Sequence, residues 1–209
     1  MSFIMRDEFK IAYEKANIIL SKLNINSCRH EMMRTADIID AVEEELGLDI
    51  KFTTLDFKKL DKGTHGRIFN VELFGAAMCA SAKEKQAIIL LNEKETPEMQ
   101  RFSLVHELGH LMIQDLSEFS GYKVSTHIDM DITSIPNEIL DRKGFEFLVE
   151  EQQANIFALL VLIPYELLKK VAKEHDSFDG MAKALGVEKN AIISRMELER
   201  PFADGGTNG

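Results

Sequence analysis

The chain has 209 residues, of which 45% are hydrophobic and 29% charged, and its 35 acidic and 25 basic residues give a net charge of −10. This composition is too apolar for a disordered chain, and the length allows a domain with a substantial core plus a small appendage. The acidic balance argues against sequence-independent nucleic-acid binding, which requires a basic surface.

The N-terminal part of the chain predicts two amphipathic helices and a strand. Apolar residues recur at helical spacing over residues 8–24 and again over 31–47. Gly47 is a suitable C-cap for the second helix, because glycine adopts left-handed backbone angles without steric cost. The next residues are rich in strand-forming side chains and predict a strand near 48–57.

A hairpin and a capped helix follow. The short apolar runs 74–81 and 86–92 are separated by polar residues, which predicts a hairpin whose inner strand is buried. Thr96 can cap the next helix, Pro97 suits its first position, and Glu98 favours the positive end of the helix dipole. We expect this helix to continue through the sequence MQRFSLVHELGHLMIQ.

The second half of the chain predicts one more strand and four helices. Apolar residues at even-numbered positions from Val124 to Ile132 predict a half-buried strand within the polar segment 117–144. A helix over 145–162 ends before Pro164. Three shorter helices complete the chain: 165–175, 178–185 and 188–199.

The cysteines and the N-terminal residues predict a cytoplasmic protein. Cys28 and Cys79 are too few for a disulfide framework, so we expect reduced thiols. The first residues mix charged and apolar side chains, unlike a signal peptide. No stretch of the chain approaches the roughly 18 uncharged apolar residues of a membrane span, so we expect no membrane partner.

The sequence His106-Glu107-Leu108-Gly109-His110 is an HExxH motif within the predicted helix. Residues i and i+4 lie one turn apart on one face, so both imidazoles can bind one Zn²⁺ ion at about 2.0–2.1 Å. Glu107 lies beside them and can take a proton from a water molecule on the metal, which makes it the predicted general base. Gly109 costs about 1 kcal/mol relative to alanine in a helix, and we expect a side chain there to crowd the backbone beside the metal.

A catalytic zinc site needs a third protein ligand and an open fourth position. The HExxHxxGxxH pattern is absent, because Ile113 and Leu116 stand where that pattern needs glycine and histidine. Carboxylates of the following helix are the alternative: Glu146, Glu150 and Glu151. We predict Glu151, because Asn155 follows it on the same helical face and can accept the remaining N–H of a ligand histidine.

The segments RFSLVHELGHLMI and EQQANIFALLVLIP together resemble the ImmA/IrrE family of zinc metallopeptidases. The family pattern joins an RF-x-hydrophobic-x-HELGH helix to ExxAN, F-A and a closing proline, here Pro164. The strand QAIILLN with Asn92 and the segment GMAKALGVEKNAIISRMEL extend the resemblance over roughly residues 34–200. The resemblance implies one Zn²⁺ ion per chain on three ligands, with Glu107 as base: His106, His110 and Glu151.

These elements and the resemblance predict an α+β, zincin-like fold. We expect a small mixed or antiparallel sheet packed on helices, followed by a C-terminal helical segment of helix-turn-helix proportions. The predicted division is a metallopeptidase domain over 1–164, a helical subdomain over 165–200 and a disordered tail over 201–209.

The resemblance implies an endopeptidase that cleaves a specific protein, such as a helix-turn-helix transcriptional repressor encoded nearby on a mobile element or stress operon. An alternative is a non-proteolytic regulator, or a toxin-like binding module paired with a repressor-type antitoxin. A second alternative is a DNA-binding regulator that uses residues 178–199. The acidic and basic residues balance over 179–200, which is poor for phosphate contact and argues against this alternative.

The segment between HELGH and Glu151 is acidic and long for the family, which indicates an insertion over 117–144. Residues 114–151 contain nine acidic and three basic residues, a large share of the net charge. We expect carboxylates such as Asp129 and Asp131 to favour cations or basic peptides near the site. Hydrolysis also needs a donor for the developing oxyanion. Three candidates lie near the motifs in sequence: Tyr122, His127 and Tyr165.

Overall fold

The computed structural model describes residues 7–23, 32–56, 76–81, 83–114, 123–126 and 142–203. Its elements are, in chain order, α1 (Asp7–Lys22), α2 (Thr35–Leu46), β1 (Asp49–Leu55), β2 (Ala76–Ser81), β3 (Gln86–Asn92), α4 (Pro97–Ile113), β4 (Lys123–Thr126), α5 (Arg142–Leu162), α6 (Tyr165–Glu174), α7 (Phe178–Leu185) and α8 (Lys189–Ala203). The predicted α+β class is confirmed.

The four strands form one mixed sheet in the order β1-β3-β2-β4. β3 pairs in parallel with β1 and antiparallel with β2, so the predicted hairpin is confirmed. β4 pairs antiparallel with β2 and confirms a strand within the segment 117–144. The rest of that predicted strand, from residue 127 on, lies outside the described residues.

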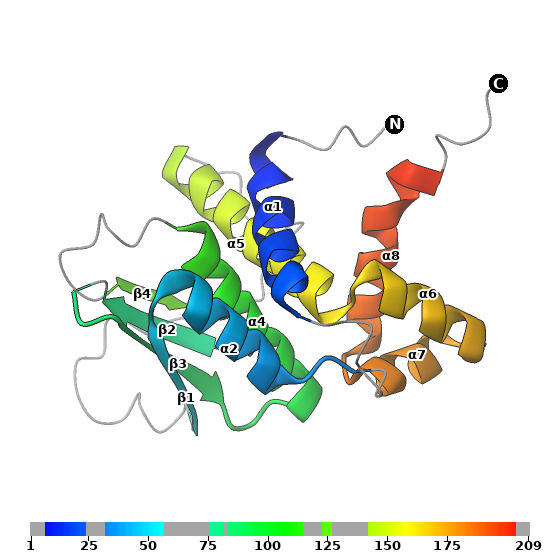
Figure 1. Ribbon diagram of the computed structural model, residues 1–209, viewed down its shortest axis with the longest axis horizontal. Coiled ribbons are helices and arrows are strands. Elements are labelled where there is room, and N and C mark those ends of the chain that lie inside the picture. Colours follow the sequence, from blue (N-terminus) through cyan, green and yellow to red (C-terminus); the bar gives the residue numbers. More distant parts are fainter. Residues whose placement is uncertain are drawn as a thin grey trace.

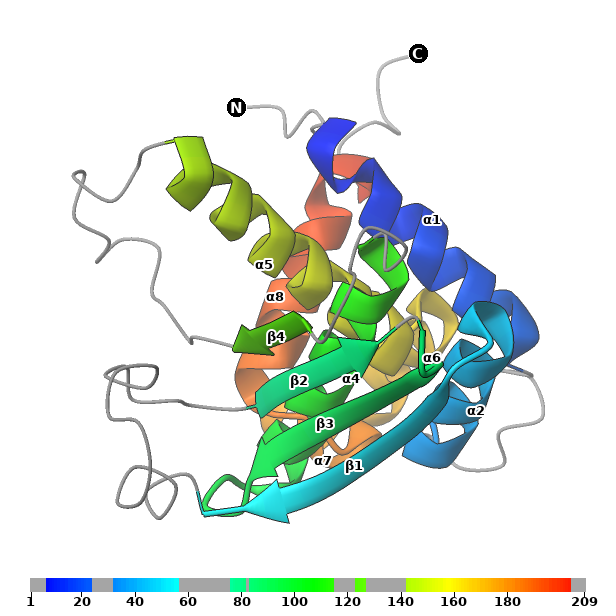
Figure 2. The same cartoon turned by 90° about the vertical axis from the view of Figure 1, so that its left-hand side faces the viewer.

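The inner strand β3 is buried on one face only. Ala87, Ile89 and Leu91 are buried, whereas Ile88 between them is 40% exposed. Figure 2 shows the sheet facing the viewer with α4, α6 and α7 behind it. The prediction of a buried inner strand was therefore wrong for half of its side chains, because helices pack against a single face of the sheet.

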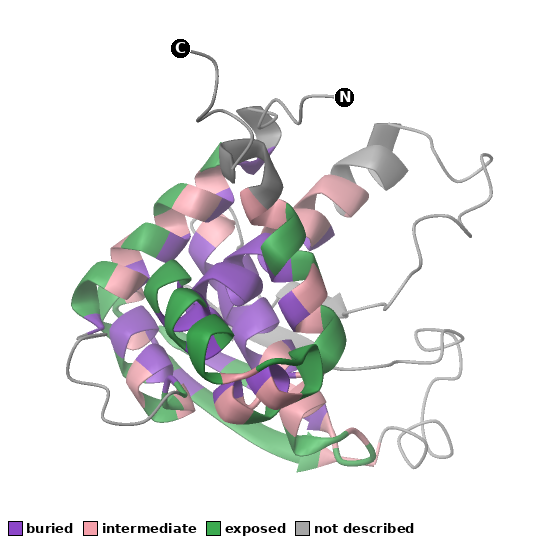
Figure 3. Cartoon of the chain, turned by 90° about the vertical axis from the view of Figure 1, so that its right-hand side faces the viewer, coloured by how far each residue is buried: buried purple, intermediate pink, exposed green. Residues whose placement is uncertain are grey.

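Helix α4 is the central element of the molecule. It begins as predicted, with the Thr96 hydroxyl accepting a hydrogen bond from the amide of Met99 at 3.1 Å. The ten consecutive residues Ser103–Met112 are all buried. The sheet lies on one side of α4, and α1 and α5 lie on the other, so buried residues gather in the middle of the helical layer (Figures 1 and 3). Polar residues of this stretch are thereby carried into the interior.

Arg101 connects α4 to two distant parts of the chain. Its Nη1 donates to the carbonyls of Leu185 at 2.6 Å and Gly186 at 2.8 Å, and its Nη2 donates to the carbonyl of Met33. Burial lowers the pKa of Arg101 to about 10, so the guanidinium is still charged at neutral pH. The side chain thereby ties the start of α2 and the end of α7 to the helix that contains the HExxH motif.

The C-terminal helices have the predicted helix-turn-helix proportions. Gly186 ends α7 in the left-handed conformation, and α8 begins three residues later. Buried Arg195 of α8 donates from Nε to the carbonyl of Ile163 at 2.9 Å, which attaches α8 to the end of α5. Lys189, at the start of α8, pairs with Asp179 at 3.0 Å rather than offering an isolated positive charge to phosphate.

Some predictions of chain organisation are not tested by these elements. α8 reaches Ala203, so helix extends into the segment predicted as a tail, whose residues 204–209 lie outside the described part of the chain. The domain boundary after residue 164 stays a prediction.

Cys28 lies outside the described residues, so the state of the two thiols stays a prediction. No described helix is long and apolar enough to cross a membrane.

Candidate metal centre

Four ionisable side chains lie together in the interior where α4 meets α5. His106 and Glu107 are 0% exposed, His110 is 2% exposed and Glu151 is 8% exposed. Burying such groups is unfavourable unless they are paired or bind a metal. Their gathering inside an otherwise apolar core therefore marks a functional site rather than a packing feature.

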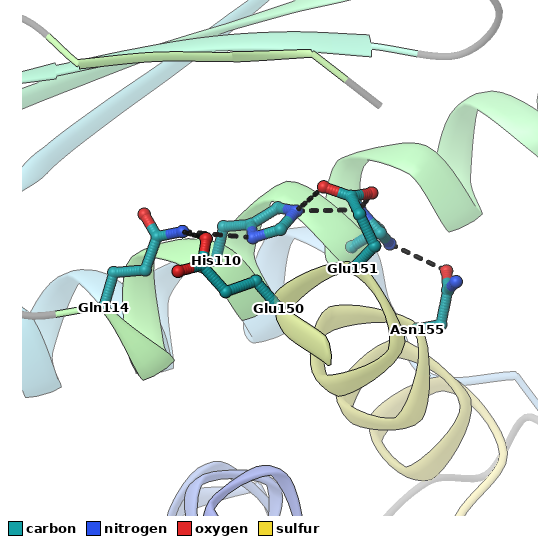
Figure 4. A network of polar contacts seen from close by, with 6 residues as sticks. His110, Gln114, Glu150, Glu151 and Asn155 are labelled. Atoms are coloured by element: carbon teal, nitrogen blue, oxygen red, sulfur yellow. Dashed lines mark hydrogen bonds and ion pairs between the residues drawn. The ribbon is translucent and has the colours of Figure 1, made fainter. Parts of the chain in front are cut away.

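Three of these residues form a triangle of possible ligand atoms (Figure 4). The Nε2 atoms of His106 and His110 are 3.0 Å apart, and the Glu151 carboxylate oxygens lie 3.3 Å and 3.1 Å from them. Ligand atoms about 2.0–2.1 Å from a tetrahedral metal ion lie about 3.3 Å from one another. The three side chains therefore fit a single tetrahedral ion, and they can hold one.

Asn155 orients the first histidine. Its Oδ1 lies 2.8 Å from Nδ1 of His106, where it accepts a hydrogen bond from the ring N–H. With its proton on Nδ1, the ring presents the lone pair of Nε2 toward Glu151, which is the arrangement that a metal requires. Asn155 thus lies where its spacing from Glu151 predicted.

The charges around His110 favour a cation. Burial lowers the pKa of His110, but the hydrogen bond that its ring donates to Glu151 and the charges of Glu107, Glu151 and Glu150 outweigh this effect and raise the pKa above its ordinary value. Three carboxylates therefore act on one imidazole in the interior. A divalent cation at the Nε2 atoms would compensate this charge better than a single proton does.

Gly109 lets the two helices approach closely. A Cβ atom at this position would lie 3.0 Å from Cδ1 of Phe157 and 3.2 Å from the Cα and carbonyl oxygen of Ala154. Ala154 lies three residues after Glu151 on α5. The contact at Gly109 therefore sets how near the Glu151 carboxylate comes to the histidines. As expected from the sequence, a side chain at position 109 would crowd backbone, and that backbone belongs to α5.

Gly109→Ala is accordingly expected to weaken metal binding, although alanine is the better helix former by about 1 kcal/mol. The new methyl group must push α5 outward by a few tenths of an ångström. We expect the zinc affinity, measured by competition with a chromophoric chelator, to fall about tenfold. Gly180→Ala, in helix α7, is the control for adding a methyl group to another crowded helical glycine, because a Cβ there would lie 3.3 Å from His175 and Ser177. Equal zinc affinities of both variants would contradict the explanation.

Gln114 and Glu150 form a second polar pair at His110. Gln114 Nε2 lies 3.5 Å from His110 Nδ1 and donates to Glu150 Oε2 at 3.2 Å (Figure 4). The structure thus places Glu150, a candidate third ligand in the sequence, against Gln114, whereas Glu151 faces both histidines. Sequence reasoning missed Gln114, and the available signal was its i+4 spacing from His110. The side chain of Glu146 lies outside the described residues.

Of the three predicted oxyanion donors, only Tyr165 lies in the part of the chain that the structure describes. Tyr165 opens α6, is 50% exposed, and its ring centroid lies 5.9 Å from Nζ of Lys169. Tyr122 and His127 lie outside the described residues, as do the acidic residues Asp129 and Asp131. All of these roles stay predictions.

Residues 44–129 match the family model described as the IrrE N-terminal-like domain, Peptidase_M78. The matched segment contains the whole HELGH motif and stops before Glu151. This match confirms the resemblance to the ImmA/IrrE family and supports a metallopeptidase. No curated protein matches the chain.

A transcriptional regulator of Mycobacterium tuberculosis has a similar structure, with a TM-score of 0.50 at 12% sequence identity. The similarity covers 90% of this chain and 46% of the regulator, so the chain spans less than half of that protein's length. At this identity the likeness shows a shared fold.

Proposed function

We propose that this chain, whose residues 44–129 match the IrrE N-terminal-like domain, is a zinc-dependent endopeptidase of the ImmA/IrrE family. The observation that carries the proposal is the buried triangle of His106, His110 and Glu151, with buried Glu107 beside it. Two imidazole nitrogens and one carboxylate, with a fourth position left for a reactant, are a donor set that suits catalytic zinc.

Each residue of the site has a distinct part in peptide hydrolysis. A bound zinc ion would polarise the scissile carbonyl and lower the pKa of an attacking water molecule to about 7. Glu107 accepts the proton of that water as its oxygen bonds to the carbonyl carbon. Glu107 then donates the proton to the amide nitrogen as the C–N bond breaks, so the amine leaves neutral. Asn155 keeps the His106 ring oriented throughout.

The substrate that we propose is a specific protein in the cytoplasm, namely a helix-turn-helix transcriptional repressor encoded nearby on a mobile element or stress operon. The family resemblance supports this choice of substrate. The balanced charge of residues 179–200 supports a protein partner over DNA, because phosphate contacts need an excess of basic residues.

Removal of the metal tests the proposal. We expect the purified protein to contain one zinc ion per chain and to cleave a repressor encoded beside its gene. Dialysis against 1,10-phenanthroline should abolish cleavage, because the chelator removes the ion that His106, His110 and Glu151 are proposed to hold. Added Zn²⁺ should restore cleavage. Metal content is measured by atomic emission and cleavage by mass spectrometry of the products. Tight complex formation with the repressor but no cleavage would instead favour the binding-module alternative.

A further inference from the structure

Ser103 is a buried polar residue of α4 whose presence the packing of the helix does not explain. It is 0% exposed, and its hydroxyl makes no hydrogen bond within the described part of the chain. A serine inside a helix commonly donates to the carbonyl four residues earlier, here that of Met99, but the Ser103 hydroxyl does not. A buried hydroxyl without a partner is unfavourable, and alanine is the better helix former. Serine is therefore a poor choice for stability at this position.

Ser103 lies on the face of α4 that carries the candidate site. A helix turns by about 100° per residue, so Ser103 is directed between His110, about 20° away around the helix axis, and Glu107, about 40° away. All three residues are buried, and the helix is continuous from Pro97 to Ile113. The hydroxyl is therefore on the side of α4 where the hydrolysis that we propose takes place.

The spacing from Ser103 to Glu107 favours a direct relation between these two side chains. They are four residues apart on one helix, which makes them neighbours on its surface. Helical side chains lean toward the N-terminus, so that of Glu107 extends back over the turn that contains Ser103. Because the Ser103 hydroxyl is not used by the helix backbone, its hydrogen is available to the Glu107 carboxylate.

We propose that Ser103 is a positioning residue for Glu107, and that its hydroxyl donates a hydrogen bond to the carboxylate directly or through one water molecule. The bond holds the carboxylate in the orientation in which it takes the proton of the attacking water and returns it to the amide nitrogen. A carboxylate has two oxygens with several lone pairs, so one oxygen can accept this bond while the other handles the proton. The inference rests on the proposed function, because it assigns a part in the same hydrolysis.

Ser103→Ala tests the inference, because activity and stability should change in opposite directions. We expect kcat for the repressor to fall about tenfold, the loss that one hydrogen bond to a charged group accounts for. KM and zinc affinity should stay at their wild-type values, because the hydroxyl acts through the base alone. The melting temperature of the metal-free protein should rise by about 2–4 °C, since a buried hydroxyl without a partner is removed. A serine that merely packs in the helix would give this gain in stability with no loss of kcat.

Two further variants complete the experiment. Ser103→Thr keeps the hydroxyl and should retain most of the wild-type kcat. Ser194→Ala removes an exposed helical hydroxyl on α8 and is the matched control, which should leave kcat and KM unchanged. A low kcat of Ser103→Thr at a wild-type melting temperature would count against the hydroxyl as the active group.

The failure of this inference differs from the failure of the proposed function. Wild-type kcat in Ser103→Ala would overturn the inference while the wild-type protein still cleaves the repressor. A raised KM at unchanged kcat would also overturn it, because that result marks a residue that contacts the substrate. A wild-type protein that binds zinc but does not cleave would overturn both.

Discussion

Glu107→Gln is expected to abolish peptide cleavage while zinc content stays at one ion per chain. The substitution keeps the size of the side chain and removes the ability to accept a proton. General bases contribute about 10²- to 10⁴-fold to the rate, so the cleavage rate should fall by at least about 10²-fold. Quantitative mass spectrometry of repressor fragments, together with metal analysis of the same sample, measures both quantities.

The fold should survive this change, which makes the experiment interpretable. Glu107 is 0% exposed, and a glutamine at this position would fill the same volume without a buried charge, whose desolvation is unfavourable. We therefore expect a melting temperature at or above that of the wild-type protein. Glu98→Gln, in the first turn of the same helix, is the matched control and should cleave normally. Unimpaired cleavage by Glu107→Gln would assign the base to another group.

Local chemistry explains which features could be predicted from the sequence. Thr96, Pro97 and Gly47 predicted helix ends because a cap depends only on the few residues beside it. The HExxH spacing placed two imidazoles on one helical face, and the step from Glu151 to Asn155 did the same on α5. Each of these inferences concerns a single helix, where the distance between side chains follows from their spacing along the chain.

Features that depend on packing between elements were not predictable in the same way. The amphipathic pattern of α4 gave one apolar face, yet the helix is enclosed by the sheet, α1 and α5 (Figure 1). The contact of Gly109 with Ala154 joins two helices and depends on how closely they cross. The hydrogen bond of Gln114 to Glu150 likewise spans 36 positions of the chain. A single sequence does not reveal which residues of different helices come into contact.

Glu151→Gln is expected to cause the largest loss of metal affinity among these variants. The carboxylate is the only anionic corner of the triangle, lying 3.3 Å from His106 Nε2 and 3.1 Å from His110 Nε2. A neutral amide of the same size is a poor zinc ligand, so the affinity should fall by more than the roughly 10- to 100-fold lost on removal of a supporting residue. Cleavage at limiting zinc should disappear with it. Glu166→Gln, an exposed position on α6, is the control.

The pH dependence of zinc uptake distinguishes a lost ligand from a disturbed fold. In the metal-free protein the pKa of His110 is raised, with Glu151 as its hydrogen-bond partner, so the folded state retains a proton to higher pH than the unfolded chain does. That contribution to stability is complete below the unfolded pKa and is lost as the pH rises through the folded one. Zinc must displace the same proton, so zinc affinity of the wild-type protein should decrease as the pH is lowered.

Glu151→Gln removes the hydrogen bond and one of the charges that raise the pKa of His110, so the pKa of that imidazole should fall. The melting temperature of the metal-free variant should consequently depend less on pH than that of the wild-type protein over the range in which His110 titrates. Histidine ring signals in NMR spectra of the metal-free proteins report the pKa directly. An unchanged pKa of His110 combined with wild-type zinc affinity would exclude Glu151 as the third ligand and leave Glu150 to be tested in its place.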